Sequence, residues 1–264
     1  MSENLNNLIP YMKQIMAENT DIITKVLELY KTASPEKIRG LIEKHFIPSE
    51  KEKKENAEIP TPVKLVDEML DKIPKSFWTK PQKVLEPCCG KGNFVLGIFD
   101  RFYNGMKRKY KGKEAELCKI IITECLYFID IEDLNVFITK SLLICHCKMY
   151  AKDIIIDDTK DFNCIVENTL EVDIKDKMDI DGFNAVIGNP PYQNKNATGD
   201  NKLYLEFIKM AINILKKNKY LLFIVPINVK NYITNQEKNR SYINKFLNLK
   251  YLSLNTANKY FPNI

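Results

Sequence analysis

The chain has 264 residues, 45% of them hydrophobic, and its 40 lysine or arginine residues outnumber 34 acidic residues, which gives a net charge of +6. This composition excludes a disordered or fibrous protein and allows one substantial α/β domain with a small appendage. Without a long apolar run or a signal-peptide pattern, we expect a soluble, cytoplasmic protein with no membrane contact, in which the seven cysteines are reduced thiols.

The first part of the chain is predicted to be helical. Apolar residues recur there at helical spacing, and Ser34-Pro35-Glu36 is typical of a helix start. The stretch from Pro48 to Pro60 is charged and poor in apolar residues, which indicates a linker. We therefore divide the chain into an N-terminal helical segment with its linker, residues 1–57, and a main domain, residues 58–264.

The main domain alternates short apolar strands with helices. Strands are predicted at 83–87, 126–131, 183–189 and 220–226, and the clearest helix at 203–217. This alternation is typical of an α/β fold, namely a Rossmann-like, doubly wound, mostly parallel sheet with helices on both faces. Such sheets bind ligands at the carboxyl ends of their strands, so the chemistry is expected there.

The first strand ends in LEPCCGKGNF, Leu85 to Phe94. Gly90 and Gly92 can adopt positive φ or let the backbone approach a ligand closely, although a short Gly-x-Gly also fits an ordinary strand-to-helix turn. Glu86, followed by Pro87, favours a ligand site, because a carboxylate at this place can accept hydrogen bonds from an ammonium group.

The second strand ends in FIDIED, with Asp130 where doubly wound folds place the carboxylate that binds ribose hydroxyls. Asp130 lies 38 residues after Gly92, whereas about 20 is usual. A helix inserted at roughly 111–125 would account for the difference. Because acidic residues are also common on solvated strand ends, Asp130 alone does not decide between the two interpretations.

The strand at 183–189 runs into Asn189-Pro190-Pro191-Tyr192. Proline cannot donate to a sheet, so the two prolines end the strand and stiffen the loop. The Asn189 side-chain oxygen and the Pro190 carbonyl can then accept the two hydrogens of one planar amino group. Tyr192 can stack on the ring that carries this group, an interaction worth about 1–3 kcal/mol. The alternative is a plain proline turn.

LEPCCGKGNF together with VIGNPPYQ resembles the S-adenosylmethionine-dependent class I methyltransferases that act on adenine N6 in DNA, in the group whose cofactor motif precedes the catalytic motif. The resemblance covers about 58–264. It implies transfer of a methyl group from S-adenosylmethionine to a flipped-out adenine of double-stranded DNA, as in restriction-modification enzymes.

The resemblance also implies residue roles. The implied catalytic residues are Asn189, Pro190, Pro191 and Tyr192. The implied cofactor-binding residues are Thr61, Pro62, Glu86, Pro87, Gly90, Gly92, Asp130, Ile131, Asn168 and Asn189. Asn168 stands where the family usually has aspartate, and its amide oxygen can accept the same hydrogen bond without charge. Phe261, in KYFPN, is implied to pair with Tyr192 around the flipped base; the alternative is an ordinary core aromatic.

No metal site is predicted. Cys145-His146-Cys147 places its cysteines too close together, because structural zinc sites have about two to four residues between paired cysteines, not one, and need four ligands. His45, the other histidine, is expected at a helix end and is given no chemical role.

Other functions stay open. The same Asn-Pro-Pro-Tyr motif serves enzymes that methylate a protein glutamine or an RNA base. The long loop after Tyr192 and the Phe261 motif favour a nucleobase. A non-catalytic binding subunit that kept the fold is a further alternative. The family's last strand and target-recognition domain are not visible before Ile264. We therefore expect a recognition domain or a nuclease to be supplied by a partner or by a longer chain.

Overall fold

The structure of the protein is a computed structural model that describes residues 39–40, 60–192 and 202–229. Residues 39–40 are helical. The rest of the predicted N-terminal helices, the linker and Phe261 lie outside the described residues, so these predictions stay untested.

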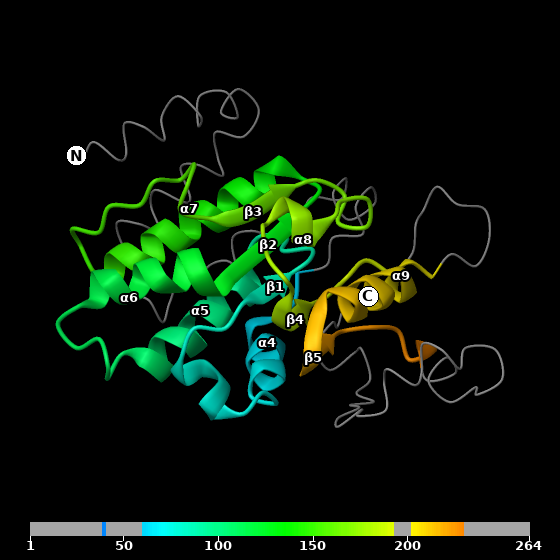
Figure 1. Ribbon diagram of the computed structural model, residues 1–264, viewed down its shortest axis with the longest axis horizontal. Helices are drawn as coiled ribbons and strands as arrows, with labels where there is room; N and C mark the ends of the chain where they lie inside the picture. Colours follow the sequence, from blue (N-terminus) through cyan, green and yellow to red (C-terminus); the bar gives the residue numbers. More distant parts are fainter. Residues whose placement is uncertain (1–38, 41–59, 193–201, 230–264) are drawn as a thin grey trace.

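Helices and strands alternate through the main domain (Figure 1). In chain order they are α4 (Val63–Leu70), the 3-10 helix η1 (Lys75–Thr79), β1 (Val84–Glu86), α5 (Asn93–Met106), α6 (Glu114–Ile120), the π-helical turn η2 (Ile121–Cys125), β2 (Leu126–Asp130), α7 (Asp133–Tyr150), β3 (Asn163–Val166), α8 (Ile174–Lys177), β4 (Phe183–Gly188), α9 (Leu203–Ile214) and β5 (Leu215–Phe223). The alternation of strands and helices predicted from the sequence is confirmed.

The five strands form one parallel sheet in the order β3-β2-β1-β4-β5. The chain builds outward from β1 through β2 to β3, and then crosses to the other side of β1 to add β4 and β5. This order confirms the doubly wound, Rossmann-like sheet. The strand order reverses between β1 and β4, and the carboxyl ends of these two strands are where such folds bind ligands.

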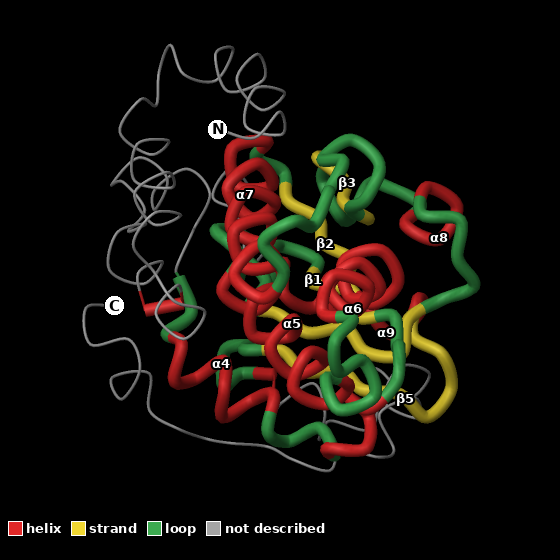
Figure 2. The backbone as a smooth tube through the Cα atoms, turned by 90° about the vertical axis from the view of Figure 1, so that its left-hand side faces the viewer, coloured by secondary structure: helices red, strands yellow, loops and turns green. Residues whose placement is uncertain are grey.

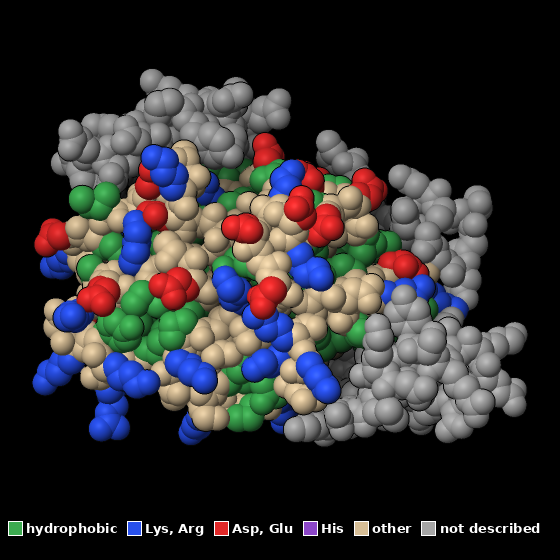
Figure 3. Space-filling model, viewed as in Figure 1, with side chains coloured by type: hydrophobic (Ala, Val, Ile, Leu, Met, Phe, Trp, Pro, Cys, Tyr) green, Lys and Arg blue, Asp and Glu red, His purple; other side chains and the backbone are tan. Residues whose placement is uncertain are grey.

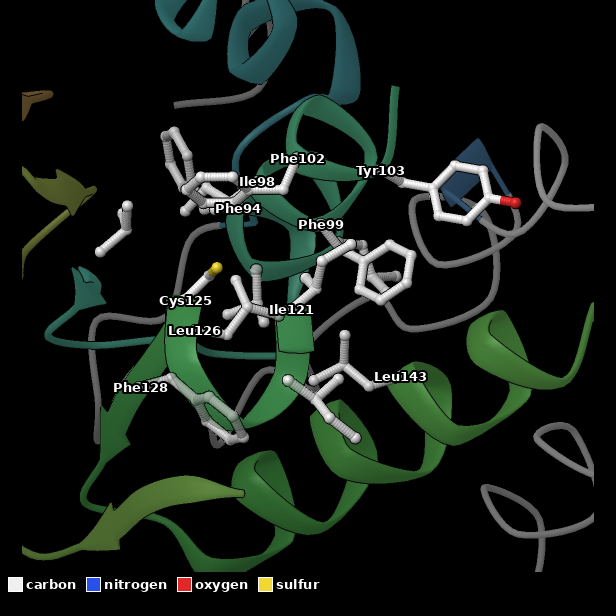
Figure 4. Packing of buried hydrophobic residues seen from close by; sticks show 14 of the residues in the cluster. Phe94, Ile98, Phe99, Phe102, Tyr103, Ile121, Cys125, Leu126, Phe128 and Leu143 are labelled. Atoms are coloured by element: carbon white, nitrogen blue, oxygen red, sulfur yellow. The ribbon is translucent and has the colours of Figure 1, made fainter. Parts of the chain in front are cut away.

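Helices cover both faces of the sheet (Figure 2). On one face, α4, α5, α6 and α7 pack against alternate residues of the strands. Figure 4 shows Phe99 and Phe102 of α5 and Leu143 of α7 gathered around Leu126 and Phe128 of β2, all of them almost completely buried. This cluster fixes α5 and α7 relative to the sheet, and both helices begin at its carboxyl edge.

The opposite face of the sheet packs against α8 and α9. Leu85 and Val186 of the two central strands contact a cluster that includes Ile174 of α8 and Ala211 of α9. Successive residues of a strand point to opposite faces, and both faces here are apolar. This explains why the strands appear in the sequence as continuous apolar runs, as expected for a parallel sheet.

Three predicted boundaries of β5 and its preceding helix were wrong. The helix predicted at 203–217 ends at Ile214, and the strand predicted at 220–226 begins at Leu215 and ends at Phe223. The first part of β5 carries exposed lysines, including Lys217 and Lys219, because the pairing with β4 shifts between Leu215 and Tyr220 and the residues between them bulge out of the ladder. An apolar pattern therefore begins only near Tyr220, five residues into the strand.

The helix predicted at 111–125 is confirmed as α6 and η2. It accounts for the long spacing between Gly92 and Asp130. The seven cysteines are free thiols. Within the described ranges, no helix is both long and apolar enough to cross a membrane.

Candidate active site

The loop between β1 and α5 has the backbone conformation that its glycines predict. Gly90 has a φ of 49° and Gly92 a φ of 87°, both in the left-handed region that favours glycine. Thr139 of α7 lies behind this loop, and its hydroxyl donates to the Gly90 carbonyl at 3.2 Å. A β-carbon on Gly92 would lie 3.0 Å from Thr139 Oγ1, so a side chain at this position would press against α7.

Asp130, at the carboxyl end of β2, holds this loop from the other side. Its Oδ2 accepts the Gly90 N–H at 2.7 Å, and its Oδ1 accepts the Glu132 N–H at 3.0 Å and the Asn135 side-chain amide at 3.1 Å. Burial raises the pKa of Asp130, although these hydrogen bonds oppose the shift. Ile131 follows with 60% of its surface exposed, so an apolar surface lies beside the carboxylate.

Glu86 ends β1 and is 1% exposed. Its Oε1 accepts the Cys88 N–H at 3.4 Å, while its Oε2 is buried without a hydrogen-bond partner among the described residues. Burial raises the pKa of Glu86 well above its ordinary value, and the nearby Asp130 adds to the shift. A buried carboxyl with an unused oxygen is suited to bind a cationic group, which would both fill the vacant hydrogen bond and favour ionisation.

Gly188, the last residue of β4, lies directly against the Glu86 carboxylate. A β-carbon on Gly188 would lie 2.2 Å from Glu86 Oε1 and 2.9 Å from its Cδ, closer than real contacts allow. Gly188 is not among the glycines with positive φ, so this close approach, and not backbone conformation, accounts for glycine at this position. The strand end that leads into Asn189 is thereby brought against the strand end that carries Glu86.

The loop after β4 carries its polar groups close to the sheet. Asn189 and Tyr192 are half-buried and Pro190 is buried. The Tyr192 hydroxyl donates to Asn189 Oδ1 at 3.0 Å. Burial, with a smaller contribution from nearby Cys88, raises the pKa of Tyr192 to about 12, so the phenol stays protonated and remains a donor. The β1 loop and the β4 loop therefore meet in one site.

Thr61 and Pro62 directly precede α4, and Thr61 contacts the first residue of α5, just after the β1 loop. The Asn93 side-chain amide donates to the Thr61 carbonyl at 2.8 Å, and both residues are buried. Asn93 Oδ1 is buried without a hydrogen-bond partner within the described part of the chain. The structure thus places Thr61 beside Asn93, the residue that follows Gly92.

Asn168 lies in the loop after β3. Its side-chain nitrogen donates to Glu171 Oε1 at 2.7 Å, and its Oδ1 accepts the Leu170 N–H at 3.2 Å. The neighbouring Thr169 is buried and donates to the Pro87 carbonyl at 2.5 Å. This bond ties the β3 loop to the β1 loop, so the site gathers the carboxyl ends of four strands.

The Cys-His-Cys stretch lies on α7, away from this loop cluster. Cys145 and Cys147 are buried, and His146 Nε2 lies 2.7 Å from Asp100 Oδ1 of α5. The histidine therefore joins two helices that pack together, which is a structural role.

Sequence reasoning missed several residues that shape the site. They are Gly188, Asn93, Thr139, Asn135 and Thr169. Gly188 immediately precedes the proline loop, and Asn93 immediately follows the glycines, so both could have been proposed from position alone. The two threonines and Asn135 have no such signal, because their bonds depend on how α7 and the β3 loop pack.

Glu86 gives the ligand-free protein a pH-dependent stability. Its folded-state pKa is raised, so the stability that it contributes is complete below its ordinary pKa and is lost as the pH rises toward the raised value. Between pH 4.5 and pH 8, we expect the melting temperature of Glu86→Gln to fall less than that of the original protein. The corresponding difference in the free energy of unfolding is up to about 1.4 kcal/mol per pH unit.

Melting curves at several pH values, recorded without ligand, test this expectation. Glu124→Gln is the control, because Glu124 is exposed. Parallel curves for Glu86→Gln and the original protein would show that Glu86 is ionised without cost, which would contradict the argument.

Three comparisons with known proteins bear on this site. The family model described as "Eco57I restriction-modification methylase" matches residues 124–259, slightly more than half of the chain. No curated protein sequence matches significantly. A modification subunit of a putative type I restriction enzyme from Vibrio vulnificus YJ016 has a similar structure, with a TM-score of 0.51 and 17% identity over 75% of this chain and 41% of that one.

The protein DrdV, in a complex with DNA, is also similar, with a TM-score of 0.52 and 15% identity over 74% of this chain and 23% of that one. Identities this low show a shared fold and no more. The chain spans less than half the length of either protein.

Proposed function

The chain belongs to the Eco57I restriction-modification methylase family, and from this premise we propose that it transfers a methyl group from S-adenosylmethionine to the N6 amino group of a flipped-out adenine in double-stranded DNA. The observation that carries the proposal is the contact between Gly188 and the Glu86 carboxylate. It joins an acidic cofactor loop to the Asn189-Pro190-Pro191-Tyr192 loop, which is suited to hold an amine.

The residues of the β1 loop fit the cofactor. Glu86 Oε2 is buried without a partner among the described residues, and a carboxylate there suits the ammonium group of the methionine part. Asp130 would accept the ribose hydroxyls, and the exposed Ile131 beside it would contact the adenine ring. Asn168 keeps one lone pair of its Oδ1 for the adenine amine. When bound, S-adenosylmethionine supplies an electrophilic methyl group.

The proline loop would position the target amine. Asn189 Oδ1 and the Pro190 carbonyl are both hydrogen-bond acceptors, and Pro190 and Pro191 restrict the backbone that carries them. Two acceptors on one amino group favour a tetrahedral nitrogen with its lone pair free. They also stabilise the positive charge that develops on this nitrogen during transfer, as preorganised dipoles do in many active sites. No side-chain nucleophile is required.

Tyr192 has two proposed roles. Its ring would stack on the flipped base, with Phe261 as the second aromatic. Its hydroxyl donates to Asn189 Oδ1 at 3.0 Å, which fixes the asparagine so that its oxygen, and not its nitrogen, faces the amine. Because an amide oxygen has two lone pairs, it can accept both the tyrosine hydroxyl and one amine hydrogen.

The two roles of Tyr192 can be separated by substitution. Tyr192→Phe keeps the ring and loses one hydrogen bond, so we expect kcat to fall about fivefold, as for the loss of about 1 kcal/mol. Tyr192→Ala also loses stacking. We expect it to bind the DNA target about ten- to hundredfold more weakly than Tyr192→Phe does, as for the loss of roughly 1–3 kcal/mol. Single-turnover rates and DNA binding measured for both variants test this. Equal behaviour of the two variants would contradict the stacking role.

Transfer of labelled methyl from S-adenosylmethionine to duplex DNA, free RNA and a protein extract tests the proposed function, with the product nucleoside identified. We expect N6-methyladenine in DNA that disappears with Asn189→Ala. Label in RNA or in protein glutamine would support the proposed role of the proline loop in holding an amine, but the substrate would then be RNA or protein and not DNA. Cofactor binding without transfer to any of the three would indicate either that a part needed for recognition is missing or that the chain is a non-catalytic subunit.

We also propose that target recognition requires parts outside this chain, because the chain spans 41% and 23% of the two solved proteins that it resembles. A recognition domain or a nuclease would then come from a longer chain or from a partner subunit. We expect residues 1–264 alone to bind S-adenosylmethionine and to methylate DNA poorly. Robust, sequence-specific methylation by residues 1–264 would contradict this.

A further inference from the structure

Basic residues concentrate in one range of the chain, and the proposed chemistry uses none of their side chains. The range 72–113 holds eleven lysine or arginine residues and two acidic residues, whereas the range 153–181 holds ten acidic and three basic residues. Figure 3 shows one face of the molecule, with Lys and Arg side chains (blue) along its lower edge and Asp and Glu side chains (red) mainly above them. Charge is therefore segregated on the molecule, which a uniformly lysine-rich composition does not explain.

Two segments that are separated in the sequence form this surface, which we name the basic edge. Its exposed residues are Lys72, Lys75, Lys80, Lys107, Arg108, Lys109, Lys111 and Lys113. Lys75 begins η1, Lys72 and Lys80 lie on either side of it, and the other five residues lie between α5 and α6. Lys109 Nζ donates to the Thr79 carbonyl at 2.9 Å, which joins the two segments directly.

Packing under the basic edge makes it a continuous surface. A β-carbon on Gly105 would lie 2.2 Å from the Trp78 carbonyl oxygen, so glycine at this position lets η1 lie against the last turn of α5. The Trp78 and Phe102 rings meet edge to face with centroids 5.0 Å apart. The basic edge is thus built on buried aromatic contacts, which hold its two segments in fixed relation.

The topology places the basic edge far from the candidate active site. η1 precedes β1, and α5 starts at the carboxyl end of β1 and runs back across the sheet, so its last turn lies at the amino edge. A helix of 14 residues spans about 20 Å. DNA phosphates that bind to the basic edge are therefore not the phosphates next to the flipped base.

We propose that the basic edge is a second DNA-binding surface, which contacts the phosphate backbone at the amino edge of the sheet, remote from the base that enters the active site. Clustered lysines bind phosphates through charge and release counterions, without reading sequence. The choice of DNA among polyanions rests on the proposed function. The side chains of four members make no hydrogen bond or ion pair within the described residues and are available for phosphates. They are Lys75, Lys80, Arg108 and Lys111.

The test is the salt dependence of binding to a long fluorescent duplex by the full chain. Each phosphate contact contributes about −0.9 to the slope of log Kobs against log salt concentration. We expect Arg108→Gln with Lys111→Gln to make the slope shallower by about 2, and the addition of Lys75→Gln and Lys80→Gln to roughly double that change. Melting curves confirm that each variant is folded.

The matched control is Lys152→Gln with Lys175→Gln, which removes the same charge from exposed positions beside acidic residues. The control pair is expected to leave the slope unchanged. An unchanged slope for Arg108→Gln with Lys111→Gln, or the same change in the control pair, would overturn the proposal. An equal loss of binding to polyglutamate would indicate a general anion surface and would also overturn the assignment to DNA.

Methyl transfer to a short duplex separates this proposal from the proposed function. We expect the basic-edge variants to retain it, because none of the substituted residues belongs to the active site. If methyl transfer is absent from every variant while the contrast in slopes persists, the proposed function fails and the basic edge stands. If transfer persists and the slopes do not differ, the proposed function stands and the proposal for the basic edge fails.

Discussion

Asn189→Ala is expected to lower kcat for methyl transfer by about 10²–10³-fold, the usual cost of removing one preorganised polar group from a site where charge develops. The alanine removes the side-chain acceptor and leaves the Pro190 carbonyl. Because the interaction strengthens only as positive charge develops on the amine, binding of S-adenosylmethionine is expected to change less than about tenfold. Single-turnover rates with labelled cofactor, and calorimetry of cofactor binding, measure the two effects separately.

Asn184→Ala is the matched control for this prediction. Asn184 lies near the start of β4, at the end of the strand opposite to Asn189, and its Oδ1 accepts the Lys83 N–H at 2.9 Å. Its loss is expected to reduce stability by about 1–3 kcal/mol and to leave kcat nearly unchanged in the folded enzyme. Equal losses of kcat in both variants would show that Asn189 supports the strand and does not act on the substrate.

Asn189→Asp refines the same argument. A carboxylate still accepts hydrogen bonds from the amine and from the Tyr192 hydroxyl, which donates to Asn189 at 3.0 Å. We therefore expect the aspartate variant to keep more activity than the alanine variant. If it is as inactive as the alanine variant, the neutral amide has a role that acceptor capacity does not explain.

The strand ends were predictable because a parallel sheet buries its strands on both faces. Apolar runs that stop at Glu86, Asp130 and Asn189 therefore mark one edge of the sheet, and the structure places all three residues there. The same logic failed for β5, whose exposed lysines break the apolar run. It also gave no explicit bounds for β3, in which Ile165 is the single buried residue of four.

The supports behind the site could not be predicted from local sequence. Thr169 bonds to Pro87 across 82 positions, Thr139 to Gly90 across 49, and Asn93 to Thr61 across 32. Such bonds follow from the packing of helices and loops at the sheet edge, and hydrophobic periodicity carries no trace of them. The sequence pattern therefore predicts which polar residues end the strands better than which groups hold those strand ends in place.

Gly188→Ala is expected to separate the two halves of the site. The added β-carbon would lie 2.2 Å from Glu86 Oε1, and Glu86 is buried, so the carboxylate must move or β1 and β4 must separate. Overpacking of this kind costs about 1–3 kcal/mol of stability. Displacing the only proposed partner of the cofactor ammonium is expected to weaken S-adenosylmethionine binding by more than about tenfold, as for the loss of a charged hydrogen bond. Melting curves and calorimetry measure both.

A double variant distinguishes steric overlap from a general defect of β4. Glu86→Ala removes the carboxylate that the new methyl group meets, so the destabilisation by Gly188→Ala is expected to shrink in its presence, with a coupling energy of about 0.5–3 kcal/mol. Cofactor binding is expected to stay weak in the double variant, because the ammonium partner is gone. Strictly additive stabilities would show that alanine at position 188 disturbs the strand by another route. Recovery of cofactor binding in the double variant would remove Glu86 from the cofactor site.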